Sequence, residues 1–468
     1  MRLLHNAGVV RASFDDPNLV SSAGLEPVMR LAESCDLHGI VRERLHVPSH
    51  KGSNASGKVA TIVAGMVTGA DSIDDLDVVR HGGMPQLFGS VYAPSTLGEF
   101  LRAFTHGHVR QLQAVSREFL VQLARRTALL PGAGAVTFVD VDSLLRRVYG
   151  KKKQGVGFGH AKVGGYKVLL RGYNPLVATI STPDAAPVIA ATQLRAGNAS
   201  SARGAASLVA EAIATTNAVL AVQPAAVTGE IVVRADSAFY SRKVIGACRR
   251  ARVRFSVTIR VDKKVRRTIE AIPPDAWVEI EYPQPVWDDE QRRFISRAQI
   301  AETRYTAFEN TPDEVTARLI VRRIPDLNKT ALDAQGELFT VWRYHAAFTD
   351  SPFILVQAEE QHRGHAVIEQ VFAELIDGPL AHLPSGVFDA NNAWLACIAI
   401  AHNLTRAAAT LAGRRYALAR AATIRRHLIN LAGRIARHAR GITIHLPQHW
   451  PWQHPWLRLF SATHAPPA

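Results

Sequence analysis

The chain has 468 residues, 47% of them hydrophobic and 20% charged, a composition that excludes a disordered, collagen-like or coiled-coil protein. At about 150 residues per domain, this length predicts about three domains. Lysine and arginine outnumber aspartate and glutamate by 55 to 40, and the net charge of +15 favours a polyanionic partner such as nucleic acid. Three scattered cysteines exclude a disulfide framework and predict a cytosolic protein.

Residues 1–131 are predicted to form a helical N-terminal domain for DNA binding or assembly. Apolar residues recur there at helical spacing over 25–31 and 59–67. A proline- and glycine-rich break at 131–135 is followed by short runs of β-branched residues. A second domain therefore begins at about residue 132.

Residues 132–260 are predicted to form the first part of an α/β core. Three strands joined by glycine-bearing turns suggest a meander, and a helix, a strand, a helix and a strand follow it. The predicted strands are 136–142, 166–170, 176–181, 231–235 and 253–259, and the predicted helices are 201–222 and 241–251. The order βββ-α-β-α-β is that of a ribonuclease H-like fold.

The rest of the chain is predicted to contain three further parts. Residues 261–350 are charged, proline-interrupted and strand-rich, which predicts a β-rich insertion. Helical periodicity returns over 351–389, the second part of the core, and continues through a basic helical C-terminal region at 390–468. No apolar stretch has the ~20 uninterrupted residues of a membrane span, so we expect no contact with a membrane.

Acidic residues follow two of the predicted central strands. Asp142 ends the strand FVDV, and Asp236 follows the strand IVVRA. The carboxyl ends of such strands are where α/β sheets place their chemistry. Glu369 is the candidate third acid, at the edge of a helical stripe formed by Ile368, Val371, Phe372 and Leu375.

Three carboxylates suit two divalent ions, Mg²⁺ or Mn²⁺, which take oxygen ligands and can activate a water or a 3′-hydroxyl for attack on a phosphodiester. Asp140 is an alternative to Asp142 as a ligand. A single aspartate at a strand end is more often a turn cap, and a single helical glutamate is more often solvated. Their joint occurrence in this order of elements favours a catalytic site.

Several blocks of the sequence resemble the DDE transposases of bacterial insertion sequences, in particular insertion-sequence family 1380, the first DDE-domain group. The blocks are FVDVDSLLRRVYGKKKQG, VRADSAFY, HRGHAVIEQVFAEL, HLPSGVFDANNAWL and IAHNLTRA. They occur in the family's order over nearly the whole chain, with 94 residues from Asp142 to Asp236 and 133 from Asp236 to Glu369. The resemblance implies that these three acids are the metal-binding triad and that 261–350 is the insertion that such transposases carry before the glutamate.

The chain departs from its relatives near two of the acids. Many relatives have Asp-x-Asp-x-Thr where this chain has Leu144 in place of the threonine. Related transposases often have Tyr and Arg seven and four residues before the glutamate, where this chain has His362 and His365 on the predicted face of Glu369. Arg363 could replace one of these DNA contacts.

Basic and aromatic residues elsewhere are further candidates for DNA contacts. Lys151, Lys152 and Lys153 follow the first acid, and Arg249 and Arg250 follow the second, although solvated surface charge is an equal alternative. The tryptophans 277, 287 and 342 of the insertion could stack on an unpaired base, but core packing is the likelier role of each.

The C-terminal region holds much of the net charge. No Asp or Glu follows Asp389, whereas ten arginines do. Helices over 390–440 are predicted to turn an apolar side to the core and their arginines outward, as a DNA-binding surface beside Glu369. The residues proposed for this surface are Arg414, Arg415, Arg425 and Arg426. A solubility surface or salt bridges to acids of the N-terminal domain are the alternatives.

The function expected from the sequence is that of a DNA transposase. It would bind the terminal inverted repeats of a mobile element, cut both ends and join the 3′-hydroxyls to target DNA, as a homodimer on DNA in the bacterial cytoplasm. A ribonuclease H-like nuclease without strand transfer and a domesticated, non-catalytic DNA-binding protein are the alternatives.

Overall fold

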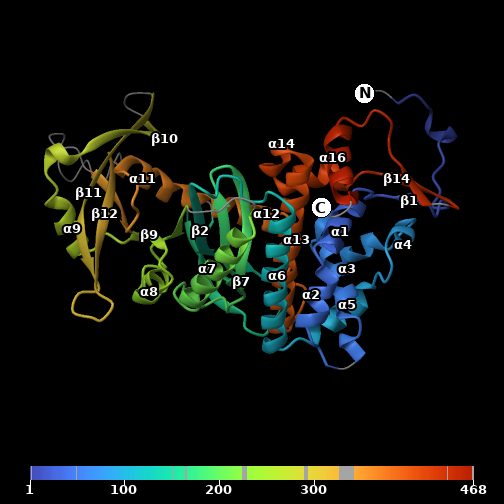
Figure 1. The fold of residues 1–468 in the computed structure, drawn as a ribbon, viewed down its shortest axis with the longest axis horizontal. Coiled ribbons are helices and arrows are strands. Elements are labelled where there is room, and N and C mark those ends of the chain that lie inside the picture. Colours follow the sequence, from blue (N-terminus) through green and yellow to red (C-terminus); the bar gives the residue numbers. More distant parts are fainter. Residues whose placement is uncertain are drawn as a thin grey trace.

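The computed structural model describes residues 1–468 except 2, 49, 151, 164–165, 224–228, 289–292, 326–341, 440 and 466–468. The molecule is elongated, with helices of both chain ends at one side, a large sheet in the middle and the strands of residues 278–349 at the other side (Figure 1).

The N-terminal region is helical, as the sequence predicts. Its elements are η1 (Ala7–Val9), β1 (Leu19–Val20), α1 (Leu25–Ser34), α2 (Leu37–Arg44), η2 (His50–Gly52), α3 (Ala55–Thr68), η3 (Asp74–Val79), α4 (Met84–Leu87), α5 (Pro94–Arg102) and α6 (His106–Arg126). Side chains fix where two of these helices begin: Asn54 accepts a hydrogen bond from the Gly57 N–H at α3, and Thr105 with His108 forms a capping box at α6.

One nine-stranded sheet forms the centre of the molecule, in the order β10-β11-β12-β13-β9-β8-β2-β6-β7. Its core strands are β2 (Val136–Ser143), β6 (Leu176–Thr182), β7 (Ala185–Gln193), β8 (Glu230–Ala235) and β9 (Arg254–Ile259). β2, β8 and β9 run parallel, whereas β6 is antiparallel to both β2 and β7. α7 (Ala205–Ala221) and α8 (Arg242–Arg250) connect the later strands, so the carboxyl ends of β2 and β8 meet at one edge.

The predicted meander is partly wrong. Residues 166–170 belong to β5 (Tyr166–Tyr173), which lies in a separate three-stranded sheet with β3 (Arg146–Arg147) and β4 (Gly157–Val163). The third antiparallel strand of the core is instead β7, which the sequence reading missed. Its segment AAPVIAATQ is rich in alanine and contains Pro187, features that weaken a strand pattern.

The strands of the predicted insertion continue the central sheet. β10 (Val278–Asp288), β11 (Arg293–Ala307), β12 (Val315–Pro325) and β13 (Trp342–Thr349) are antiparallel neighbours, and β13 pairs with β9. Two short helices, α9 (Lys263–Glu270) and η4 (Pro274–Ala276), precede them. After β13 the chain enters α11 (Leu355–Arg363), η5 (Gly364–Ala366) and α12 (Val367–Ile376).

The C-terminal region packs against the N-terminal helices. α13 (Phe388–Ala412) contacts α1, α3, α5, α6, α16 and β7. It is long and apolar enough to span a membrane, but 89% of its most apolar window is buried in the protein, as in the core helix of a soluble protein. It is followed by α14 (Arg414–Ala417), α15 (Ala421–Ile424), the π-helical turn η6 (Arg425–Ile429), β14 (Gly433–His438), β15 (Gly441–His445) and α16 (Gln453–His464).

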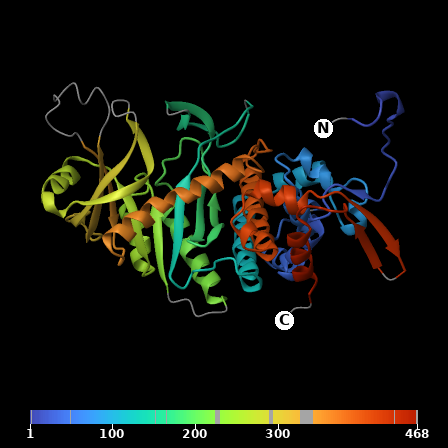
Figure 2. The ribbon, with the colours of Figure 1, turned by 90° about the horizontal axis from the view of Figure 1, so that it is seen from above.

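One part of the predicted C-terminal helices is a strand. β14 spans most of the segment GRIARHA that was predicted to be helical, and it pairs with β1 on one side and β15 on the other. Figure 2 shows this sheet at the end of the molecule remote from residues 278–349. The alternation of buried and exposed residues in β14 covers few positions, and its partner strand lies about 415 residues away, where Leu19 pairs with Arg434. This signal is weaker than the helix preference of the Ala and Arg residues.

Candidate active site

The two aspartates of β2 have different surroundings, although both lie on one face of the strand. Asp140 is completely buried. Its Oδ1 accepts hydrogen bonds from Arg234 Nε at 2.7 Å and from His365 Nδ1 at 2.9 Å, and its Oδ2 accepts from Arg234 Nη2 at 2.8 Å. Both oxygens of Asp140 are therefore engaged within the protein, and Asp142 is the acid at the strand end.

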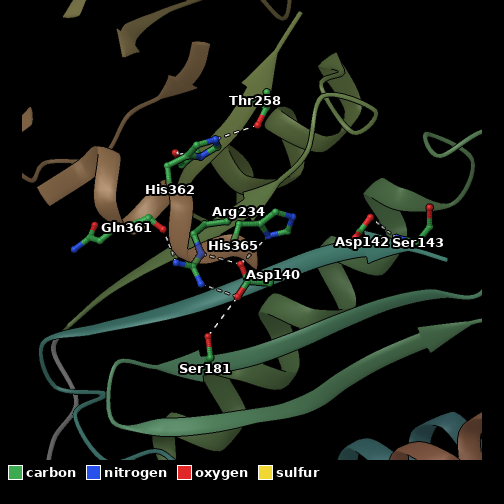
Figure 3. Close-up of polar contacts among 10 residues, drawn as sticks. Asp140, Asp142, Ser143, Ser181, Arg234, Thr258, Gln361, His362 and His365 are labelled. Carbon is green, nitrogen blue, oxygen red and sulfur yellow. Dashed lines mark hydrogen bonds and ion pairs between the residues drawn. The ribbon is translucent and has the colours of Figure 1, made fainter. Parts of the chain in front are cut away.

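Arg234 completes this buried pair from the neighbouring strand. It is the register partner of Asp140 across β2 and β8, and its guanidinium lies 3.8 Å from the centre of the Phe138 ring. It also donates to the main-chain carbonyl of Gln361, near the end of α11 (Figure 3). The ion pair thereby joins two strands of the sheet to the helical segment that precedes Glu369.

The pKa of Asp140 reflects this pairing. Burial by itself would raise the pKa, but the charge of Arg234 and the hydrogen bonds from His365 and Arg234 outweigh burial, and the pKa lies below its ordinary value. Asp140 is therefore a permanent anion that Arg234 neutralises.

Asp142 lies at the end of β2, away from that ion pair (Figure 3), and accepts a hydrogen bond from the Ser143 N–H at 2.6 Å. Burial raises its pKa to about 6, and the negative charges of Asp236 and Glu369 act in the same direction. The Ser143 hydrogen bond and the charge of His365 oppose this rise. Three acids that repel one another create a site that a cation would stabilise.

Asp236 and Glu369 come from different elements. Asp236 directly follows β8 and accepts a hydrogen bond from the Ala238 N–H at 2.9 Å. Glu369 lies exposed in the first turn of α12, whose buried residues are Ile368, Val371, Phe372 and Leu375, as the sequence predicts.

The three acids fit a hard divalent cation by the chemistry of their donor atoms, because all are carboxylate oxygens. Within the described residues, however, no group of three or more His, Cys, Asp or Glu side chains is gathered closely enough to hold a metal ion. The ligand set is therefore not preformed in this conformation.

His362 and His365 precede Glu369 in one helical segment and border the same cavity as this acid. The helix is interrupted by η5, which contains Gly364. His362 turns to β9, where its ring nitrogens contact Ser256 Oγ at 2.9 Å and Thr258 Oγ1 at 3.0 Å. Burial lowers the pKa of His362 to about 3, so this ring is neutral. Both histidines make contacts inside the protein, and their DNA-contacting role stays a prediction.

Arg363 is also engaged within the protein, since its Nε lies 2.8 Å from an Oε of Glu359, which pairs with Arg322 as well. These side chains line a cavity of about 550 Å³ between α11 and the strands β12 and β13. His362, His365 and Glu369 border the same cavity. Glu369 therefore lines the same cavity as Arg322 and Arg363.

The other predicted DNA contacts differ in exposure. Lys151 and the side chain of Trp287 lie outside the described residues. Lys152 is exposed, but Lys153 donates to the carbonyls of Leu383 and Ser385, at 2.9 and 3.3 Å. Arg249 and Arg250 are exposed at the end of α8.

Trp277 and Trp342 both contact Arg323, whose guanidinium lies 3.9 Å from the ring centre of Trp277 and 4.4 Å from that of Trp342. These contacts within the protein agree with packing, the likelier of the two expected roles.

The C-terminal arginines do not form the uniform outer surface that the sequence predicts. Arg414, Arg415 and Arg426 are exposed. Arg425 is partly buried, and burial lowers its pKa. Arg406 is buried and paired with Glu374, while Arg434 lies 3.1 Å from Asp16 of the N-terminal region. The alternative of salt bridges to N-terminal acids therefore holds for Arg434.

Comparison with known proteins assigns the chain to a family. No curated protein matches it. The model of the family described as transposase DDE domain group 1 matches residues 4–465, nearly the whole chain. With acids at the ends of two adjacent parallel strands and a third on a following helix, the chain belongs to the DDE transposases of this group.

Proposed function

We propose that this transposase cuts the ends of an insertion sequence and joins the resulting 3′-hydroxyls to target DNA, with Asp142, Asp236 and Glu369 as its catalytic acids. The observation that carries the proposal is the placement of Asp142 and Asp236 at the carboxyl ends of the adjacent parallel strands β2 and β8, where Val141 pairs with Ala235 although the two acids lie 94 residues apart in the sequence. Glu369 follows the helical segment whose His365 contacts Asp140 of β2 at 2.9 Å. Family membership supplies the reaction class.

The core is proposed to be ribonuclease H-like. Support comes from its strand order β7-β6-β2-β8-β9, in which β6 runs opposite to the other four strands. In chain order these are strands 3-2-1-4-5. The first and fourth of them end at Asp142 and Asp236, where the acids of such a core are expected.

The proposed ligands of two Mg²⁺ or Mn²⁺ ions are the three acids. Two bound divalent ions would activate the attacking oxygen and stabilise the leaving oxygen of the phosphodiester. The chain's own contribution is to hold carboxylates in place: the Ser143 N–H orients Asp142, the Ala238 N–H orients Asp236, and the buried pair Asp140–Arg234 attaches the segment before Glu369 to the sheet. At pH 7, a pKa of about 6 leaves Asp142 ionised in most molecules.

The proposed partners are the terminal inverted repeats and the target DNA, bound by a homodimer that assembles on DNA. The proposed location is the bacterial cytoplasm at the nucleoid, and the proposed subgroup is insertion-sequence family 1380. The charge of +15 supports binding to DNA.

The test uses Asp142→Asn, Asp236→Asn and Glu369→Gln in the full chain, with the DNA that flanks the gene as substrate. Each should lose cleavage while keeping its affinity for the ends, because DNA affinity comes mainly from basic residues elsewhere. Glu360→Gln is the matched control, since this exposed acid lines the same cavity as Glu369 and lies outside the proposed triad.

Two outcomes would favour the alternatives. Cutting without joining to a second DNA would indicate a nuclease without strand transfer. Binding to the ends without cutting by the unsubstituted protein would indicate a DNA-binding protein that has lost catalysis. Wild-type cleavage by Asp236→Asn would refute the proposed triad.

A further inference from the structure

A small three-stranded sheet directly follows Asp142 in the chain. β3, β5 and β4, here called the ribbon, pair with one another and not with the central sheet. Figure 2 shows the ribbon standing out from the body of the molecule beside that sheet. Its exposed position distinguishes it from the core strands that follow.

The base of the ribbon is fixed to the segment that follows α12. Arg146 Nε donates to the Leu380 carbonyl at 2.9 Å, and the Gln154 N–H donates to the Gly386 carbonyl at 2.9 Å. The buried Tyr173 ring meets Phe388, the first residue of α13, at 5.8 Å between ring centres. The ribbon is therefore anchored between the segments that carry Asp142 and Glu369.

The ribbon and its flanks are strongly basic. Residues 143–183 contain no Asp or Glu but eight Lys and Arg. Three of these, Arg146, Lys153 and Arg171, donate to main-chain carbonyls, and the segment itself holds no carboxylate that would balance their positive charge. The net charge of this segment is thus +8, more than half of the charge of the whole chain.

One face of the ribbon exposes apolar side chains amid this charge. Phe158 is opposite Arg171 and His160 is opposite Leu169, so all four lie on one face. Phe158 is 60% exposed and Leu169 is 55% exposed. The other face carries glycines near the body: a Cβ on Gly159 would lie 2.3 Å from the Gly197 carbonyl oxygen. The glycine face therefore packs closely on the body, whereas Phe158 and Leu169 of the opposite face are exposed to solvent.

Two tyrosines extend the exposed surface. Tyr149, 70% exposed, lies beneath the guanidinium of Arg147, at 4.8 Å from its ring centre. Tyr166, 79% exposed, begins β5. Exposed aromatic rings between cations are the combination that binds nucleic acid, because rings stack on bases while cations contact phosphates.

We propose that the ribbon is a DNA-binding arm that holds the strand next to the phosphodiester to be cut, with Phe158 stacking on a base that is unpaired there. This proposal rests on the proposed function, because it takes the cut phosphodiester to lie at Asp142. Charge complementarity favours DNA as the partner of the ribbon, because a segment with eight Lys and Arg and no Asp or Glu attracts a phosphate backbone.

The experiment measures binding to an end duplex with two unpaired nucleotides at the cut, in the full chain carrying Asp236→Asn to prevent cleavage. Adding Arg147→Gln and Lys152→Gln should make the slope of log K against log[salt] shallower by about 1.8, at about 0.9 for each lost phosphate contact. Adding Phe158→Ala should weaken binding by roughly 5- to 150-fold on this probe and much less on a fully paired duplex.

Matched controls change exposed residues elsewhere. Lys263→Gln with Arg266→Gln removes two exposed cations of α9, and Phe14→Ala removes an exposed ring near the N-terminus. Neither should reproduce the effects of the ribbon variants. Thermal unfolding of every variant verifies that the fold is retained.

Three outcomes would overturn the proposal. Unchanged slope and affinity in the ribbon variants, with an unsubstituted protein that binds and cuts the ends, would remove the ribbon from the DNA interface and leave the proposed function standing. Loss of self-association in sedimentation, with unchanged DNA binding, would make the ribbon an interface between copies of the chain. Failure of the unsubstituted protein to bind or cut the ends would refute the proposed function together with the ribbon's role.

Discussion

Substitution of Asp140 and of Asp142 by asparagine should change the stability of the protein in opposite directions. Asp140→Asn removes the only full negative charge that contacts Arg234 in the described structure, and Arg234 is 3% exposed. Leaving one partner of a buried ion pair uncompensated costs about 3–5 kcal/mol. The free energy of unfolding should fall by that amount, a large part of the ~5–15 kcal/mol of an ordinary domain.

Asp142→Asn should instead stabilise the protein at neutral pH. Burial raises the pKa of Asp142 from its ordinary 3.8 to about 6, so its ionised form costs the folded state about 3 kcal/mol. Because the pKa is raised, the folded protein loses this stability as the pH rises from about 4 to about 6. Asparagine does not ionise, so the variant should not show this loss.

Urea unfolding followed by circular dichroism, between pH 4 and pH 8 and without divalent ions, measures both effects. The stability of Asp142→Asn relative to the parent should increase through pH 4–6 and stay constant above, while its cleavage activity is lost. Asp140→Asn should be less stable than the parent at every pH in this range, because the pKa of Asp140 is lowered and its charge is present throughout. Equal destabilisation by both substitutions would refute the assignment of different roles to the two acids.

Two further predictions concern the ions and the C-terminal arginines. Mg²⁺ or Mn²⁺ should support cleavage, whereas Ca²⁺ should support end binding with little cleavage, because its looser coordination positions the attacking oxygen poorly; activity that requires Zn²⁺ would contradict an all-carboxylate site. Replacing the exposed Arg414, Arg415 and Arg426 together with Gln should make the salt dependence of end binding shallower by about 2.7, whereas Arg425→Gln should lower stability and leave the slope unchanged. An unchanged slope in the folded triple variant would exclude this region from the DNA interface.

The sequence predicts the core elements where local pattern and burial agree. The apolar runs of β2 and β8 are specific because consecutive residues are buried on both faces of the sheet, and the helical stripe around Glu369 is specific because it forms one buried face. The assignment of β5 to the core fails because a strand pattern does not identify the strand's partner. β14 is missed for a related reason, since its stability depends on β1, at the other end of the chain.

The polar interior of the site is harder to predict than its acids. The sequence predicts His362 and His365 to be DNA-contacting groups, because nothing local indicates the contacts that they make with Ser256, Thr258 and Asp140. The pairing of Asp140 with Arg234 has a detectable signal: each is a charge inside an otherwise apolar strand run, and such charges require a partner. If β2 and β8 are taken as adjacent strands, the need of each buried charge for a partner predicts that Asp140 pairs with Arg234.

The pKa of Asp140 is lowered and that of Asp142 is raised because the two acids of β2 lie differently relative to α11. Position 140 is covered by the end of that helix, so an anion there requires the buried Arg234, which in turn binds the Gln361 carbonyl. Position 142 lies past this cover at the strand end, where its neighbours are acids and it contributes repulsion. The buried pair stabilises the attachment of the Glu369 segment to the sheet, and the repulsion from Asp236 and Glu369 helps to raise the pKa of Asp142. The ion pair of Asp140 with Arg234, two residues from Asp142, opposes this repulsion because it joins β2, β8 and the helical segment before Glu369.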